Sequence, residues 1–292
     1  MIKKTVGERI FSSVNVLFLL CLSIIALYPF LHVVFASFSD PTEYLSQTGL
    51  MLRPAGFSLE AYKIVFEKEE IYTGYFNTIF YVVVGTTLSM ILTITLGYSL
   101  SRKNVYWNRF MNLMVLFTMY FYGGLIPTYL LVKDIGIVNT RWAVFVPTAI
   151  NTFNLIIMRT AFQGLPDSLE EAAKIDGANQ LVILVKILVP LVKSNIAVLV
   201  LYYAVAQWNG WFQAAIYLRN GELYPLQLYL REILIIENQQ DMVIFADSAE
   251  QFALGRVVKY ATIIVSTVPI LLVYPFLQKY FTKGVMIGAV KG

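Results

Sequence analysis

Six long stretches of the chain contain no Asp, Glu, Lys or Arg, and each is close to or above the roughly 20 residues that a helix needs to cross a bilayer. The stretches are continuously apolar rather than alternating. This excludes a transmembrane β-barrel and favours helices, because lipid offers backbone amides no other partner. The pattern predicts an all-α integral membrane protein whose residues 1–292 form a single transmembrane domain. We place its six transmembrane helices at about 11–38, 74–100, 110–132, 142–160, 190–212 and 260–281.

Composition and the distribution of charge support this arrangement. The chain is 58% hydrophobic and 14% charged, whereas about a quarter of the residues in a soluble domain are charged. With both termini on the inner side, more than half of the 22 basic residues but fewer than a third of the 18 acidic residues face inward. This bias follows the positive-inside rule and predicts that both termini are cytoplasmic.

Several kinds of chemistry find no support in the residues. One cysteine and one histidine, Cys21 and His32, cannot form a disulfide or a two-histidine metal motif, so we expect no metal site and no catalytic residues. The dipeptide Gly-Lys does not occur, so the chain has no Walker A loop for nucleotide phosphates. An ion-coupled carrier would place acidic residues or a basic relay inside its spans, and the six charge-free stretches contain only His32. A membrane-embedded enzyme would need a catalytic pair or a metal cluster.

A short charged segment separates the fourth and fifth predicted helices. Ser168 and Glu171 have the spacing of a capping box, which predicts that a helix begins there. Glu170 and Lys174 are four residues apart in the favourable order. Gly177 is expected to end this helix in the left-handed conformation. A second helix should follow towards the next span, leaving a small-residue surface that is shaped to fit a groove in another protein.

This segment resembles the EAA loop of the membrane subunits of ABC importers. The sequences "EEAAKIDGA" and Pro190, 13 residues after Gly177, carry the resemblance. The stretches "NTIFYVVVGTTLSMILTITLGYSLSR", "GGLIPTYLLVKDIGIVNT" and "GVMIGAVKG" are similar to the second, shorter permease subunit of maltose-type carbohydrate importers. Hereafter the EAA segment denotes Ser168–Pro190.

The resemblance implies a division of labour among subunits. The chain would be the permease of an importer in a bacterial cytoplasmic membrane and would bind no cofactor itself, while a separate ATPase dimer uses ATP and Mg. Its other partners would be a second, related permease subunit, an external substrate-binding protein and membrane lipid; nucleic acid is not expected. The resemblance implies that the EAA segment docks on the ATPase, with Glu171 as the polar contact and Gly177 as the bend, and that the glycine-rich C-terminal tail enters the ATPase interface. The implied coupling residues are Glu170, Glu171, Ala172, Ala173, Asp176, Gly177, Ala178 and Lys291.

Aromatic and amide residues near the span ends could line a sugar pathway. Sugars are held by aromatic faces and a few polar groups on an apolar wall. The same residue types also form interfacial belts and ties between helices, so both interpretations stay open. The candidates are Tyr120, Tyr122, Tyr129, Asn151, Asn154, Gln207, Trp208, Asn209 and Trp211.

Together these observations predict the permease subunit of an ATP-driven, binding-protein-dependent carbohydrate importer that works by alternating access, with an oligosaccharide as the favoured solute. The alternatives are an ABC importer permease for another polar solute and an ion-coupled secondary carrier.

Overall fold

The computed structural model describes residues 5–243 and 249–289, and all regular structure in that part of the chain is helical. The chain divides into two compact units. One comprises Met1–Glu69 with Glu232–Val268, and the other comprises Glu70–Arg231 with Pro269–Gly292. The prediction of an all-α protein is confirmed.

The first unit contains a long apolar helix, α1 (Val6–Ser37). It begins with a capping box in which the Thr5 amide donates to the Glu8 carboxylate at 2.7 Å and the Glu8 amide donates to Thr5 Oγ1 at 3.4 Å. None of its most apolar window is buried, as expected for a helix that contacts lipid. The histidine near its end, His32, lies against tyrosine rings, with centroids 5.8 Å from Tyr260 and 6.2 Å from Tyr28.

Two short helices follow α1 in the first unit. They are α2 (Pro41–Ser46) and α3 (Glu60–Glu67). The sequence pattern of residues 57–66 predicts a short helix, and α3 confirms it. Its buried residues, Ala61 and Val65, lie four positions apart on one face.

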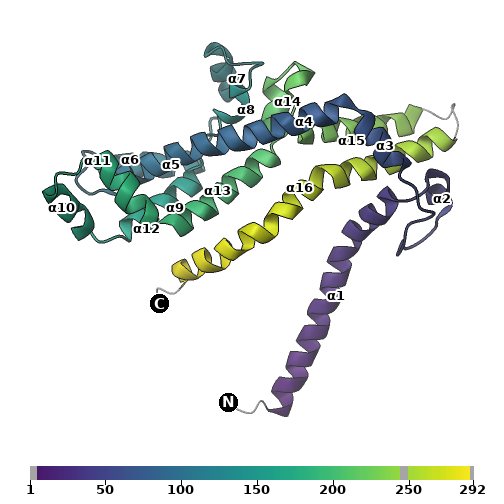
Figure 1. Cartoon of the computed structure of the whole chain (residues 1–292), viewed down its shortest axis with the longest axis horizontal. Coiled ribbons are helices and arrows are strands. Elements are labelled where there is room, and N and C mark those ends of the chain that lie inside the picture. Colours follow the sequence, from purple (N-terminus) through teal and green to yellow (C-terminus); the bar gives the residue numbers. More distant parts are fainter. Residues whose placement is uncertain (1–4, 244–248, 290–292) are drawn as a thin grey trace. The chain divides into compact units, whose positions relative to one another are not determined.

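The second unit is built on a helix that runs without a break from Glu69 to Ser101. It consists of α4 (Glu69–Phe80), a π-helical turn η1 (Tyr81–Gly85) and α5 (Thr86–Ser101). Against it pack α9 (Thr152–Gln163) and α13 (Lys193–Trp208), in teal and green in Figure 1. A Cβ at Gly97 would lie 2.8 Å from Met158 Cγ, so α5 and α9 approach closely because this position is glycine.

Within the residues that the structure describes, three helices are long and apolar enough to cross a membrane: Ile10–Ser37, Glu69–Ser101 and Phe252–Leu272. Two further pairs qualify only if each bent pair is one span. The first pair is α6 (Asn108–Tyr120) with α7 (Leu125–Asp134), bent by 116°, and the second is Gln180–Leu191 with Lys193–Trp208, bent by 87°. These helices reach five spans by length and composition, so the predicted count of six stays a prediction.

The segment predicted as the fourth transmembrane helix, residues 142–160, is not one helix. Its parts are α8 (Trp142–Phe145) and α9, which begins at Thr152. Pro147 lies between them. Proline lacks an amide proton and its ring clashes with the carbonyl four residues earlier, which accounts for the break.

Glycine and proline also mark the other two bends. Gly124, between α6 and α7, has φ +94°, a value that L side chains rarely adopt. Pro190 lies in α12 (Val189–Leu191), directly before the 87° bend. An unbroken apolar run in the sequence therefore predicted more regular helices than form.

The region that follows α13 is mostly helical as far as Val243. It contains α14 (Phe212–Tyr217), η3 (Gly221–Leu223) and α15 (Leu226–Val243). The fully buried Asn77 amide on α4 anchors it by donating to the Glu222 and Tyr224 carbonyls at 2.7 and 3.1 Å.

The last helix, α16, extends over Ala249–Ala289. The sequence predicts a non-helical tail from Lys283, because three glycines in ten residues disfavour a helix. That prediction is wrong for the described part of the tail. Extending an existing helix avoids the unfavourable nucleation step, which makes isolated glycines tolerable.

Candidate functional site

The EAA segment begins with the eight-residue helix α10 (Ser168–Ile175). Its predicted capping box does not form. The N-cap is Asp167, which has helical dihedral angles and makes no side-chain capping bond. Ser168 is therefore already inside the helix, where its hydroxyl cannot cap the first amides.

The end of α10 matches the prediction closely. Gly177 has φ +80°, and its amide donates to the Lys174 carbonyl at 3.0 Å. The next amide, of Ala178, donates to the Ala173 carbonyl at 2.9 Å. These two bonds form a Schellman motif with glycine at the left-handed position. The predicted role of Gly177 as the residue that ends this helix is confirmed.

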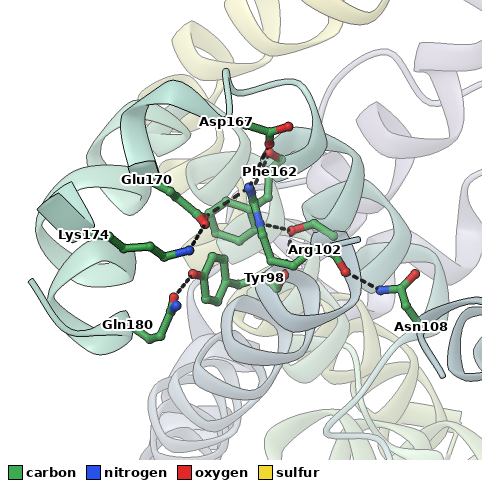
Figure 2. A network of polar contacts seen from close by, with 9 residues as sticks. Tyr98, Arg102, Asn108, Phe162, Asp167, Glu170, Lys174 and Gln180 are labelled. Carbon is green, nitrogen blue, oxygen red and sulfur yellow. Dashed lines mark hydrogen bonds and ion pairs between the residues drawn. The ribbon is translucent and has the colours of Figure 1, made fainter. Parts of the chain in front are cut away.

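A polar network holds α10 against the ends of two other helices (Figure 2). Arg102, the residue that follows α5, lies with Nη1 3.1 Å from Glu170 Oε1 and 3.7 Å from Asp167 Oδ1. Its Nη2 donates to the Phe162 carbonyl in the last turn of α9 at 2.9 Å. The guanidinium also lies 5.2 Å from the centroid of the Tyr98 ring.

The two adjacent glutamates of the EAA segment have opposite environments. Glu170 is 6% exposed and lies between Arg102 and Lys174, whose Nζ is 3.7 Å from Glu170 Oε2. The Arg102 contact is an ion pair without hydrogen-bond alignment, since Glu170 Oε1 has no hydrogen-bond donor in the described residues. Glu171 is exposed, as are Ala172 and Asp176. The geometry therefore makes Glu170 an internal residue and leaves Glu171 accessible to a partner.

A second tie joins α5 to the start of the helix after Gly177. The Tyr98 hydroxyl donates to Gln180 Oε1 (Figure 2). Asn179 caps this helix, with its side chain accepting from the Val182 amide at 2.9 Å. A cavity of about 880 Å³ opens beside the network, lined by Arg102, Lys103, Glu171 and Lys174 among others.

The EAA segment is continuous with the core of the second unit. After α11 (Gln180–Val182) the chain forms a π-helical turn, η2 (Ile183–Leu188). One cluster of buried side chains contains Ala173 of α10, Ile183 and Leu188 of η2, and Tyr203 of α13. Displacing α10 would therefore disturb α13 through close-packed side chains.

A second cavity, of about 810 Å³, lies between α9, α13 and neighbouring segments. Its lining is mostly apolar with several neutral polar groups and no charged residue among those described. Four of the predicted pathway residues line it: Asn151, Asn154, Gln207 and Asn209. Four further polar residues of the lining were not predicted from the sequence: Thr148, Tyr202, Tyr203 and Gln213.

Tyr203 of α13 lines this cavity and also bonds α5 and the residue before α9. Its hydroxyl lies 2.7 Å from Thr93 Oγ1 in α5 and accepts from the Asn151 amide at 3.2 Å. Asn151 is the N-cap of α9, and its Oδ1 accepts from the Asn154 amide at 3.1 Å. The spacing of three residues between Asn151 and Asn154 predicts that they share a helix face, and this prediction is wrong because α9 begins only after Asn151.

The other predicted pathway residues lie outside this cavity. Trp211 is covered by Arg231, whose Cζ is 3.9 Å from the centroid of the Trp211 ring. Tyr129 stacks on Tyr217 with centroids 6.0 Å apart. Tyr120 and Tyr122 are 80% and 74% exposed, and Trp208 is buried.

The structure offers no group of His, Cys, Asp and Glu side chains that could hold a metal ion within the residues searched, which are the described ones. Lys291, implied as a coupling residue, lies outside the described residues.

Comparison with known proteins places the chain among transport permeases. It is 42% identical over 98% of its length to the polygalacturonan/rhamnogalacturonan transport system permease protein YtcP of Bacillus subtilis (strain 168), covering 99% of that protein. It is 41% identical over 99% of its length to the protein LplC of the same organism, covering 97% of it. No protein-family model matches the chain.

A solved structure agrees with these relatives. A chain in the crystal structure of a bacterial ABC transporter involved in the import of the acidic polysaccharide alginate superposes with a TM-score of 0.85 and 34% identity. The match covers 96% of this chain and 100% of that one. The similarity thus extends over both the sequence and the fold.

Proposed function

This chain belongs to the permease subunits of carbohydrate ABC importers, and from that premise we propose that it imports an acidic oligosaccharide, built of uronate units, by ATP-driven alternating access. It is a multi-pass protein of the cell membrane and is not itself catalytic, since ATP hydrolysis in this family belongs to a separate subunit. The finer assignments of substrate, partners and orientation are the proposal.

The observation that carries the proposal is the structure of the EAA segment. Glu171 and Ala172 are exposed on a short helix that contacts Arg102 on its inner side, and the exposed Gly177 follows that helix. Small exposed residues beside one acidic group form a surface suited to a groove in a partner. We assign that groove to a cytoplasmic ATPase subunit, with Glu171 as the polar contact.

The proposed orientation puts the EAA segment and both termini in the cytoplasm. Six membrane crossings, with the α8–α9 region as the fourth, make this orientation consistent with the positive-inside rule. In this arrangement α15 faces outward, together with the segment whose Glu222 and Tyr224 carbonyls bind Asn77. The external binding protein would dock on this side. A second, related permease subunit would complete the pathway, because one chain supplies only part of the wall around a solute.

The solute class is proposed from the relatives and from the neutral cavity. YtcP is named for polygalacturonan and rhamnogalacturonan, and the solved neighbour imports alginate; all three polymers contain uronate units. The cavity beside Tyr203 offers amides and hydroxyls, which bind sugar hydroxyl groups, on an apolar wall. None of its described lining residues is a cation that could bind a carboxylate, so we assign charge recognition to the partner subunits.

The proposal is tested on the purified complex of both permeases, the ATPase dimer and the binding protein in lipid nanodiscs. ATP hydrolysis is measured with oligogalacturonate of two to six units and with neutral malto-oligosaccharides of the same lengths. We expect stimulation by the oligogalacturonates. Stimulation by the neutral sugars alone would reject the acidic substrate, and stimulation by neither would support another polar solute.

A further inference from the structure

Arg102 joins the ends of three helices in the second unit. It follows α5 directly, donates to a carbonyl in the last turn of α9, and pairs with an acid in the first turn of α10. We propose that Arg102 is the positioning residue that fixes α10 against the membrane helices, so that a push on the EAA segment moves α5 and α9 together with α13. The inference rests on the proposed function, since it presumes that an ATPase pushes on α10.

The geometry of Arg102 suits this role better than a lysine would. The planar guanidinium presents donors in several directions at once. Here Nη2 bonds Phe162, Nη1 faces Glu170, and Nε donates to Ser101 Oγ at 3.0 Å. A side chain held by three neighbours has little freedom, so it transmits a displacement instead of absorbing it.

Charge supports the same contacts. The Phe162 carbonyl lies at the C-terminal end of α9, where the helix dipole favours a cation. Asp167 and Glu170 lie at the N-terminal end of α10, where the dipole favours anions. The Arg102 guanidinium therefore bridges the negative end of one helix and the acids of the next.

Burial separates the role of Glu170 from that of Glu171. A carboxylate that is 6% exposed cannot contact a docked protein without leaving its cations. Leaving would break an ion pair that is largely shielded from water, since the Arg102 side chain is only 15% exposed. The two adjacent glutamates thus have different roles. Glu170 faces inward and holds α10 in place, and Glu171 faces outward, where a partner can contact it.

Without Arg102, α10 would keep its Ala173 packing and its covalent continuity with η2. The EAA segment could still dock, but its movement would reach the ends of α5 and α9 only through apolar packing and the Tyr98–Gln180 hydrogen bond, without the direct tie from α10. The expected defect is therefore loss of coupling with the complex still assembled.

The test uses Arg102→Ala, with the neighbouring exposed cation changed in Lys103→Ala as the matched control. Three quantities are measured in reconstituted complexes: the ATPase subunit retained per permease, the KM for ATP, and the sugar imported per ATP hydrolysed. For Arg102→Ala we expect full retention, an unchanged KM and about a tenfold lower ratio of sugar to ATP, a loss within the range of contact-pair coupling. Arg102→Lys keeps the positive charge but not the planar set of donors of the guanidinium. Its ratio of sugar to ATP should lie between those of Arg102→Ala and the wild type.

A double-mutant cycle with Glu170→Ala tests whether the two residues act as a pair. If they do, the double variant is no worse than Arg102→Ala, since no buried charge is left alone. The inference would be overturned if the two single variants lowered the ratio of sugar to ATP additively, or if Arg102→Ala kept the wild-type ratio. It would also be overturned if Lys103→Ala lowered the ratio as much as Arg102→Ala. Release of the ATPase subunit by Arg102→Ala would also overturn it. A wild-type complex that hydrolyses ATP without importing sugar would instead reject the proposed function.

Discussion

Replacing Gly177 with valine tests whether the bend after α10 is needed for transport. Gly177 has φ +80°, and a Cβ built there meets no atom within 4 Å. The Cβ itself therefore meets no obstacle, and the expected effect comes from the backbone conformation. A left-handed conformation costs an L residue roughly 1–2 kcal/mol, and β-branching adds to that cost.

The expected loss follows from that energy. A cost of about 1–2 kcal/mol lowers the population of the bent form roughly 5–30-fold relative to alternatives. Sugar uptake by Gly177→Val, normalised to the amount of permease in the membrane, should be lower than wild-type uptake by roughly 5–30-fold or more. The free energy of unfolding of the purified subunit should fall by no more than this cost of about 1–2 kcal/mol, because the position is exposed and only the local backbone is strained.

Two control variants isolate the cause. Gly177→Asn should retain most uptake, since asparagine tolerates the left-handed conformation. Gly164→Ala alters a glycine close to the same segment whose φ is −76°, and it should leave uptake unchanged. Wild-type uptake by Gly177→Val, or an equal loss in Gly164→Ala, would refute the reasoning.

Three other predictions concern the membrane helices and their orientation. Tyr203→Phe removes the hydroxyl that ties α13 to α5 and α9, and it should lower the free energy of unfolding by about 1–3 kcal/mol, measured by denaturation in detergent micelles. Gly85→Ala places a methyl group 3.0 Å from the Gln207 amide, and it should cost about 1–3 kcal/mol by the same measurement; an unchanged stability would mean that η1 and α13 separate easily. In a cysteine-free background, a cysteine at Lys103 should resist an impermeant thiol reagent in intact cells while one at Glu69 reacts; the reverse labelling would contradict the proposed orientation.

Local signals in the sequence predicted several features correctly. Long apolar runs predicted α1, the Glu69–Ser101 helix and α16, because burial in lipid leaves such runs no other regular structure. Gly177 was correctly predicted to adopt a left-handed conformation, since the residues that determine it are its own neighbours. These features depend on interactions within a few residues of each other.

Features that depend on residues far apart in the chain were missed. Arg102 and Glu170 are 68 positions apart, and nothing near either residue marks the other as its partner. The capping box failed because its pattern of residue types cannot show that Asp167 is already helical. Tyr203 was not predicted for a similar reason, since its partners lie in α5 and at the start of α9. The position of Arg102, a cation directly after an apolar helix, marks it in the sequence as a candidate for a role at the helix end. No feature of the sequence identifies the residues that it binds.

Uptake of radiolabelled oligogalacturonate into proteoliposomes tests the central claim most directly. The vesicles contain this chain with its second permease and the ATPase dimer, with ATP and Mg enclosed and the binding protein outside. We predict uptake that requires both ATP and the binding protein and that persists when ionophores collapse every ion gradient. Uptake that continues without ATP or without the binding protein, and stops when the ionophores are added, would contradict the account and indicate an ion-coupled carrier.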